Sequence, residues 1–599
     1  MMKYNTISKM FLNTVEQFAH NHILYYKCKN EWIGLTGKDI EVTVNDISFA
    51  LKSIGIDAGN KIAILSNNSP RWAMTDYGII CSGAATVSVY PTLIDKQVEY
   101  ILKDSGSKVA FVEDKEQFDK VNNVWSNCPD LDLVVVMDDS DQSDDKRVIN
   151  FKEMLDKGTE YAKTYGKTLK ELVEDANPED LLTLIYTSGT TGTPKGVMLT
   201  HQNLVSNMLD ILDKISITSK DTLLSFLPLS HVFERMSGHF TAFSKGAKIY
   251  YAESIETVPQ NMTEVKPTLM ISVPRLYDKM YAKVLDGIKS APSIKQKLFW
   301  WALGVGTKVS TLKLAKNSIP FMLNKKFGLA NKLVFSKIKE KVGGRLRFFV
   351  SGGAPLSKEV AEFFSAANIT ILEGYGLTET SPILTANTEE EIRFGTVGKA
   401  MSSVDIKIAD DGEILAKGPN IMKGYYKSPE ATKEVIDKDG WFHTGDIGEF
   451  DEEGFLKITD RKKNILITSG GKNVAPAPIE NSILNSVYID QIIIIGDKRK
   501  FLSALVVPAF ESVVKYLESK DISLTDNNAI IEHSAARELI NSEIEKGMQN
   551  FSDYEKVKHF ELLSEPFTIE SGELTPTLKV VRKVVESNHD ELIENIYNN

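Results

Sequence analysis

Cysteines, surplus basic charge and long apolar runs are all scarce in this chain of 599 residues. The three cysteines, Cys28, Cys81 and Cys128, form no CxxC pair and have no histidine beside them. This small, odd number favours a reducing compartment and argues against a structural metal site. No window approaches ~20 uninterrupted apolar residues, and the first twenty residues lack the apolar core of a signal peptide. We therefore expect a cytoplasmic protein without a membrane-spanning helix.

The charge balance is acidic, with 70 Lys and Arg against 81 Asp and Glu and a net charge of −11. Phosphate binding along a nucleic acid requires a surplus of basic residues, so nucleic acid is not expected as the main partner. With 42% hydrophobic and 25% charged residues, the composition is that of a globular protein. The length predicts roughly two to four domains.

Short apolar runs bounded by polar or turn residues alternate with helical patterns over the first three-quarters of the chain. We expect strands at 61–66, 108–113, 131–138, 222–230, 247–253, 268–274 and 345–353. The pattern DKQVEYILKDSG at 95–106 is typical of the helices between them. This alternation predicts an α/β fold with layered, mostly parallel sheets. The acidic run at 138–146 is expected to be a solvated loop.

Two segments depart from this pattern. From Lys295 to Arg347 there are thirteen Lys or Arg residues and one acid, Glu340, so the rest of the chain has a net charge of about −23 (−11 minus +12). Trp300 and Trp301 are among the apolar residues interleaved with this charge. Two interpretations stay open for this basic insert at about 290–347: a helical hairpin packed on the main body, or a surface that contacts anionic lipid. After residue 460, short strands and hairpins predict a small α+β domain.

The stretch YTSGTTGTPKG at 186–196 is rich in glycine and hydroxyl side chains. Glycines let backbone N–H groups approach a phosphate, hydroxyls add donors, and Lys195 adds positive charge. Pro194 and Gly196 break the GxxxxGK[ST] pattern, so this is not a P-loop. The alternative is a flexible turn after the strand LLTLIYT.

Several further stretches occur in a fixed order: FLPLSHVFER at 226–235, SGGAPL at 351–356, EGYGLTET at 373–380, the block at 439–476 and GELTPTLKVVR at 572–582. Together with YTSGTTGTPKG, they resemble the adenylate-forming superfamily of acyl-CoA synthetases, luciferases and peptide-synthetase adenylation domains. The resemblance covers nearly the whole chain. Within the superfamily, DGWFHTGDIGEFDEEGFLKITDRKK and the basic, Trp-containing insert most resemble long-chain fatty acyl-CoA synthetases.

The resemblance implies a domain organisation. A large N-terminal domain of several subdomains would span 1–459, a hinge would occupy 460–463 with Asp460 and Lys463, and a small mobile α+β domain would span 464–599. The C-terminal domain is expected to rotate between an adenylating and a thioester-forming position.

The resemblance also implies an ATP site. The residues implied to bind ATP or AMP are Thr187, Ser188, Gly189, Thr190, Thr191, Gly192, Lys195, Gly353, Ala354, Pro355, Glu373, Gly374, Tyr375, Gly376, Asp446 and Arg461. Tyr375 offers an aromatic face to adenine, and Gly376 leaves room beside it. Thr378 can contact a phosphoryl oxygen, and Glu379, with Thr190, would hold Mg²⁺. Taken alone, Asp446 reads as a turn aspartate and Arg461 as a surface charge; the resemblance assigns them to the ribose and the neighbouring phosphate.

Three further roles follow from the resemblance. Lys579 would reach the acyl carboxylate and the α-phosphate and stabilise charge as pyrophosphate leaves. His231 would position the acyl carboxylate. Ser469, Gly470 and Gly471 would close the coenzyme A channel in the second position.

The implied function is a long-chain fatty acid–CoA ligase with a fatty acid, MgATP and coenzyme A as substrates. One alternative is an adenylate-forming CoA ligase for aryl or shorter acids, and another is a catalytically inactive lipid-binding homologue. A carrier-loading adenylation domain is disfavoured, because only about sixteen residues follow residue 583. Homodimer formation and peripheral membrane contact through the basic insert complete the expected partners.

Overall fold

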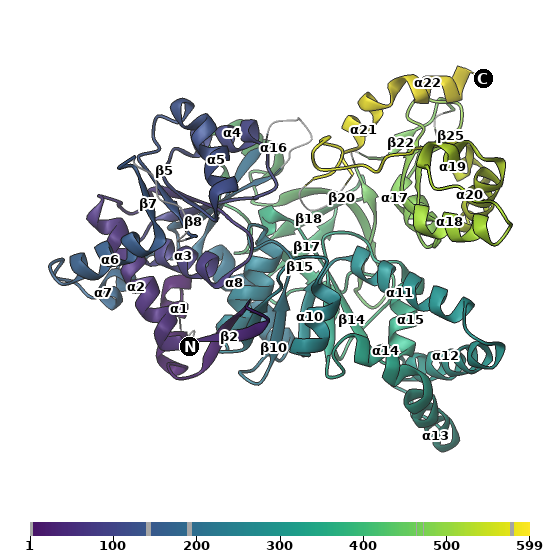
Figure 1. Cartoon of the computed structure of the whole chain (residues 1–599), viewed down its shortest axis with the longest axis horizontal. Coiled ribbons are helices and arrows are strands. Elements are labelled where there is room, and N and C mark those ends of the chain that lie inside the picture. The colour runs from purple at the N-terminus through teal and green to yellow at the C-terminus, as the bar shows by residue number, and fades with distance from the viewer. Residues whose placement is uncertain are drawn as a thin grey trace.

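Two large sheets, with helices packed around them, form the centre of the chain before residue 400 (Figure 1). The computed structural model describes residues 4–138, 145–187, 194–462, 464–470, 472–575 and 580–598. The first sheet has the strand order β16-β15-β14-β13-β12-β10-β11-β1-β2. Its strands are β1 (His22–Cys28), β2 (Glu31–Thr36), β10 (Thr222–Ser225), β11 (Lys248–Tyr251), β12 (Leu269–Ser272), β13 (Phe348–Ser351), β14 (Thr370–Gly376), β15 (Ile383–Ala386) and β16 (Lys399–Ala400).

The second sheet has the order β19-β9-β8-β4-β3-β5-β6-β7. Its strands are β3 (Lys61–Leu65), β4 (Ala85–Val89), β5 (Ser107–Val112), β6 (Leu133–Val136), β7 (Val148–Asn150), β8 (Leu181–Thr187), β9 (Lys195–Thr200) and β19 (Gly424–Tyr425). Pairings at the centre of both sheets are parallel, and antiparallel pairs lie toward the edges. The prediction of an α/β fold with mostly parallel sheets is confirmed.

The seven apolar runs all contain strands, because continuous Val, Ile, Leu and Phe suit a strand buried on both faces. The run at 222–230 is shorter than expected, since β10 ends at Ser225. Pro228 has no N–H to donate to a ladder, and the chain turns there. The helix α4 (Asp95–Ser105) matches the pattern at 95–106 and ends at Gly106 with a φ of 64°. Most of the acidic run at 138–146 lies outside the described residues.

A buried ion pair joins the two sheets. Arg235 belongs to the π-helix η2 (Phe233–Phe240), and Asp76 lies on α3 (Pro70–Cys81). The guanidinium donates to both Asp76 carboxylate oxygens at 2.8 and 2.5 Å and to the Thr183 hydroxyl on β8 at 2.8 Å. The Thr86 hydroxyl on β4 donates to Asp76 at 2.6 Å. Each charged group is therefore satisfied although both are excluded from water.

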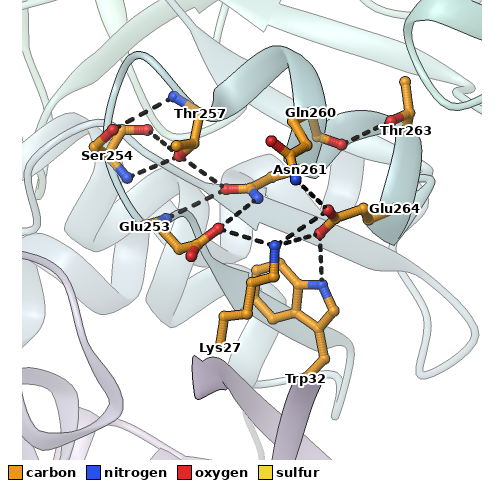
Figure 2. Close-up of polar contacts among 9 residues, drawn as sticks. All are labelled: Lys27, Trp32, Glu253, Ser254, Thr257, Gln260, Asn261, Thr263 and Glu264. Atoms are coloured by element: carbon orange, nitrogen blue, oxygen red, sulfur yellow. Dashed lines mark hydrogen bonds and ion pairs between the residues drawn. The ribbon is translucent and has the colours of Figure 1, made fainter. Parts of the chain in front are cut away.

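A second network fastens the edge hairpin β1–β2 to the loop after β11 and to the helix that follows it (Figure 2). The Lys27 ammonium lies between the carboxylates of Glu253 and Glu264, at 3.1 and 2.9 Å. The Trp32 indole N–H donates to Glu264 at 3.1 Å, and the Asn261 amide donates to Glu253 at 3.0 Å. Hydrogen bonds to Glu264 and Glu253 raise the pKa of Lys27. The network fixes the loop between β11 and α10 (Val258–Val265).

The basic insert is helical. It contains α12 (Ser293–Leu314), α13 (Phe321–Ala330), η3 (Asn331–Phe335) and α14 (Ser336–Lys341), preceded by α11 (Pro274–Lys289). Phe299, Ala302 and Phe335 are buried in a core shared with α15 (Lys358–Ala366). Figure 1 shows α12 and α13 projecting from the lower right of the molecule.

A four-stranded sheet precedes the C-terminal region: β17 (Asp405–Ile408), β18 (Glu413–Lys417), β20 (Phe442–Phe450) and β21 (Leu456–Arg461). Beyond it lie β22 (Leu466–Ile467), β23 (Asn473–Val474), β24 (Ile489–Ile495), β25 (Leu502–Pro508) and β26 (Val557–Leu562). β24, β25 and β26 form a three-stranded sheet, in which β24 and β25 are the antiparallel hairpin expected from IDQIIIIGDKRKFLSALVVP. Helices α17 (Pro476–Ile483) and α20 (Ser534–Gly547) pack on this three-stranded sheet, which gives a small α+β unit with its own core.

Candidate functional site

The carboxyl ends of the parallel strands open into one cavity of about 3400 Å³. Residues that follow β10, β12, β13 and β14 of the first sheet line it. Residues at the ends of β3, β4 and β8 of the second sheet line it as well. In open α/β sheets, ligands bind outside the carboxyl ends of the strands. The fold therefore places a binding cavity where the two sheets meet.

Most of the predicted site residues that the structure describes line this cavity. They are Thr187, Lys195, His231, Gly353, Ala354, Pro355, Glu373, Gly374, Tyr375, Gly376, Thr378, Glu379, Asp446, Asp460 and Arg461. The predicted residues Ser188, Gly189, Thr190, Thr191, Gly192, Lys463, Gly471 and Lys579 lie outside the described residues.

The glycine- and threonine-rich stretch connects two antiparallel strands. Thr187 at the end of β8 lies opposite Lys195 at the start of β9. The Lys195 ammonium lies 5.1 Å from the centroid of the Tyr425 ring. The Tyr425 hydroxyl donates to Glu379 Oε1 at 2.8 Å. Burial and the Glu379 carboxylate raise the pKa of Tyr425, so the phenol stays protonated and donates. A cation and a carboxylate are thus held on one wall of the cavity by a shared tyrosine.

A second cluster joins the first sheet to the four-stranded sheet. The Tyr375 hydroxyl at the end of β14 donates to Asp446 Oδ2 at 2.7 Å. The Arg461 guanidinium lies 3.0 Å from Asp446 Oδ1, because Asp446 and Arg461 are paired across β20 and β21. Asp446 is buried, whereas Arg461 is half exposed. The carboxylate that the resemblance assigns to the ribose is therefore already bound by two donors.

Gly376 has a structural explanation that the sequence did not suggest. A Cβ at this position would lie 1.7 Å from the carbonyl oxygen of Pro382. The glycine is thus required by the close approach of two backbone segments. Gly353, after β13, has a φ of 82°, which favours glycine.

Glu373 and His231 both line the cavity. Burial raises the pKa of Glu373 to about 8, so this carboxyl group is largely protonated at neutral pH. The Phe233 backbone N–H donates to His231 Nδ1 at 3.2 Å. In the neutral imidazole, this acceptor role leaves the proton on Nε2.

The C-terminal region reaches the same cavity. Thr575, Val580 and Arg582 line it, and they flank the segment that contains Lys579. Arg582 pairs with Glu480 and donates to the carbonyl oxygen of Ile494. Asp460 is buried at the end of β21, and its burial raises its pKa to about 6. The described residues on both sides of Lys579 therefore line the cavity.

Ser469 and Gly470, predicted for the coenzyme A channel, lie elsewhere. They are exposed in the turn between β22 and β23. The described part of the cavity lining contains neither of them. In this structure Thr575 and Val580, and not this turn, line the cavity.

Two residues of the cavity wall were missed by the sequence analysis. Tyr425 lies in MKGYYKSPE, a stretch that has the composition of an exposed turn. The Asn68 amide donates to the carbonyl of Leu227 at 2.7 Å and accepts from the Leu229 N–H at 2.7 Å. It thereby holds the PLSH segment against the second sheet. Only a comparison of the GYY tripeptide with related sequences would have indicated that Tyr425 belongs to the site. Nothing in the spacing of the sequence indicates a role for Asn68.

The strand order, the shared cavity and the small C-terminal unit define the class as a two-part α/β protein with its site between the parts. The chain belongs to the AMP-binding enzyme family, which it matches over residues 11–426. Residues 463–599 match the C-terminal domain of AMP-binding enzymes.

Known relatives agree with this membership. The long-chain-fatty-acid–CoA ligase FadD15 of Mycobacterium bovis is 35% identical over 580 residues, covering 95% of this chain and 93% of that protein. The crystal structure of the anthranilate CoA ligase AuaEII with anthranoyl-AMP has a TM-score of 0.74 at 18% identity and covers 99% of each chain. ATP-bound MatB from Rhodopseudomonas palustris has a TM-score of 0.70 at 20% identity and covers 98% of this chain and 99% of that one. The two structures show that the fold is that of adenylate-forming enzymes.

Proposed function

We propose that this AMP-binding enzyme is a long-chain fatty acid–CoA ligase. It would convert a fatty acid and MgATP to acyl-AMP and pyrophosphate, and then transfer the acyl group to coenzyme A with release of AMP. The observation that supports this most directly is the convergence of the Lys195–Tyr425–Glu379 cluster and the Tyr375–Asp446–Arg461 cluster on one cavity. The name of the 35% identical relative supports the choice of acid.

In the first reaction, a carboxylate oxygen attacks the α-phosphorus, and the bond to the pyrophosphate oxygen breaks. Lys195 and the loop at 188–192 would bind the β- and γ-phosphates, with Thr187 at the base of the hairpin. Thr378 would contact the α-phosphate, and Lys579 would stabilise the charge that develops there. The Tyr375 ring, Gly353, Ala354 and Pro355 would border adenine, and the Asp446 carboxylate would accept the ribose hydroxyls.

The carboxylate of Glu379 fits the Mg²⁺ that the family implies. Mg²⁺ takes few protein oxygens and fills its shell with phosphate oxygens and water. Glu379 lies at the cavity wall beside Lys195, and no cluster of three acidic, His or Cys ligands occurs among the described residues. A single carboxylate next to a phosphate site is the donor set expected for such an ion, with Thr190 as the second predicted ligand. When bound, Mg²⁺ would neutralise phosphate charge.

The acid would occupy the apolar part of the cavity. Leu269, Ile271, Phe348 and Val350, which face the cavity from β12 and β13, form its walls. His231 Nε2–H would donate to the acyl carboxylate and orient it toward the α-phosphate. Apolar walls of this extent favour an alkyl chain over a short acid.

The second reaction needs a different arrangement. The thiol sulfur of coenzyme A attacks the acyl carbon, the bond to AMP breaks, and the thiol proton passes to solvent. Rotation at Asp460–Lys463 would withdraw Lys579 and bring Ser469, Gly470 and Gly471 to the cavity. The exposed turn at Ser469 and the place of Thr575 and Val580 in the cavity wall support a structure in the adenylating position.

Homodimer formation and peripheral membrane contact remain predictions.

A ligase for aryl or shorter acids is the second candidate, since anthranilate CoA ligase shares the fold. The same chemical residues would serve it, so only the acyl pocket distinguishes the two.

The test is pyrophosphate release from MgATP with acids from acetate to oleate and with coumarate, each with and without coenzyme A. We expect release to peak with long-chain acids, and acyl-CoA to form only when coenzyme A is present. A peak with aryl or short acids would replace the substrate but keep the mechanism. Absence of release with every acid would refute the ligase and favour an inactive lipid-binding homologue.

A further inference from the structure

Exposed large apolar side chains are concentrated on the basic insert. Among the described residues, fifteen large apolar side chains are exposed, and seven of them lie between residues 294 and 333. They are Ile294, Trp300, Trp301, Phe321, Met322, Leu329 and Leu333. Exposed fractions reach 82% for Ile294, 69% for Phe321 and 64% for Met322. Such a concentration on one segment of the chain indicates a contact surface.

The arrangement of these side chains follows the helices. On α12, Phe299, Ala302 and Val309 are buried in the core, while Ile294 and Trp301, seven residues apart, are exposed. On α13, Ala330 alone is buried. Met322 and Leu329 are likewise seven residues apart and exposed. Leu323 and Phe327 pack against the core of the insert, whereas Phe321, Met322 and Leu329 stay exposed, although an apolar helix surface in a globular protein is normally covered.

Lysines alternate with these apolar residues. Lys297, Lys325, Lys326 and Lys332 are all exposed. The Lys325 ammonium lies 4.5 Å from the centroid of the Phe321 ring, so charge and apolar surface share one face. The segment from Lys295 to Arg347 has thirteen basic residues and one acid.

We propose that the outer face of α12, α13 and η3 binds an anionic lipid bilayer, with the helices lying in the plane of the interface. The outer face comprises the seven exposed apolar residues named above and the exposed lysines Lys297, Lys325, Lys326 and Lys332. Aromatic and aliphatic side chains would enter the boundary between headgroups and acyl chains, and the lysines would contact anionic headgroups. None of the described helices is long and apolar enough to span a membrane, so the contact lies on the surface.

Charge decides between a bilayer and a second copy of this chain. In a symmetric dimer through this face, the same lysines would meet each other across the interface, and like charges oppose association. The remainder of the protein has a net charge of about −23 (−11 minus +12), which an anionic membrane repels. Contact with such a membrane is therefore restricted to the insert, and this restriction orients the molecule.

The orientation of the protein on the membrane affects how a fatty acid would reach the cavity. This part of the inference rests on the proposed ligase function. Pro274, Arg275 and Asp278 at the start of α11 line the cavity, and α12 begins four residues after α11 ends. A helix of 16 residues spans about 24 Å, so docking would bring the cavity within roughly one helix length of the bilayer. A long-chain acid partitioned in the membrane would then have a short path to the site.

The experiment is co-sedimentation of the full chain with vesicles of phosphatidylcholine alone or mixed with phosphatidylglycerol, without ATP. We expect binding to the anionic vesicles that weakens as salt rises, and little binding to the zwitterionic ones. Lys325→Gln with Lys326→Gln should weaken binding by about 5-fold for each lysine. Trp301→Ser with Phe321→Ser should weaken it by at least about 10-fold. Ile54→Ser with Tyr554→Ser, which removes exposed apolar side chains elsewhere, should leave it unchanged.

Sedimentation is read independently of activity, so it tests the surface even if the ligase proposal fails. Absence of binding to anionic vesicles at low salt would overturn the inference. Equal loss of binding in the Ile54/Tyr554 control would overturn it too. A dimer that dissociates in the Trp301/Phe321 variant, without vesicle binding, would assign the face to a second copy. Delivery of a long-chain acid from the bilayer to the cavity is tested separately by activity. The Trp301/Phe321 variant should lose activity on vesicle-borne oleate but keep it on a short, water-soluble acid that the enzyme accepts. Equal loss of activity on both acids would refute delivery but not membrane binding.

Discussion

Removal of the Asp76 carboxylate should destabilise the large N-terminal region strongly. In Asp76→Ala, Arg235 loses two charge-assisted hydrogen bonds and keeps the one to Thr183. The Thr86 hydroxyl loses its acceptor as well. The Arg235 side chain is only 2% exposed, so water cannot replace the lost partner. Breaking one side of a buried pair costs about 3–5 kcal/mol, and we expect a loss of this size.

The assay is denaturant-induced unfolding followed by tryptophan fluorescence. The Arg235 guanidinium lies 5.6 Å from the centroid of the Trp72 ring, so this indole is close to the change. Asp76→Asn, which keeps an acceptor oxygen but not the charge, should fall between wild type and Asp76→Ala. Asp76→Leu combined with Arg235→Met should recover much of the loss, because no uncompensated charge remains. A loss below about 1 kcal/mol in Asp76→Ala would show that the pair does not connect the sheets energetically.

Three further predictions concern the site and the buried acid beside it. Tyr425→Phe keeps the ring beside Lys195 but removes the hydrogen bond to Glu379. It should lower kcat/KM for ATP by about 10-fold, measured as pyrophosphate release. Tyr426→Phe is the matched control, and an equal loss of kcat/KM in both variants would contradict the role of the Tyr425 hydroxyl. Lys579→Ala should slow adenylation by about 10²–10³-fold, whereas the rate of acyl transfer from supplied acyl-AMP to coenzyme A should change far less. Comparable losses of rate in both half-reactions would refute a role of Lys579 in adenylation alone. Burial raises the pKa of Glu234 to about 8, so its contribution to the free energy of unfolding is full at acid pH and is lost as pH rises from about 4.5 through about 8. Glu234→Gln should therefore gain stability relative to wild type between pH 5 and pH 8, measured by denaturant midpoints, and a difference independent of pH would contradict this titration.

The sequence predicts the sheets well because buried parallel strands are continuous apolar runs. The run KIAILS at 61–66 becomes β3, and RLRFFVSGG at 345–353 contains β13. Strand ends are predicted less well, since Ser225 ends β10 through a turn that depends on Pro228 and on the distant amide of Asn68. Periodicity within one segment contains no information about such a contact.

The predicted site depended on motifs, and the structure shows what motifs omit. Tyr375 was predicted for its aromatic face, yet its hydroxyl also binds Asp446, which lies 71 positions further along the chain. Tyr425 links Lys195 to Glu379 although each of these three residues comes from a different stretch. These links follow from the packing of β19 beside β9 and of the four-stranded sheet beside β14, and no local pattern encodes them.

Arg461 connects the cavity to the predicted hinge. It is the last residue of β21, it pairs with Asp446 at 3.0 Å, and the predicted hinge at 460–463 includes it. A ligand whose hydroxyl groups bind the Asp446 carboxylate must share that carboxylate with Arg461, because Tyr375 already occupies the other oxygen. Occupation of the cavity therefore changes a contact at the point where the C-terminal region begins. The residues that would bind the nucleotide and the residues that would permit rotation would thus be coupled through one carboxylate, and no separate signalling path would be needed to link them.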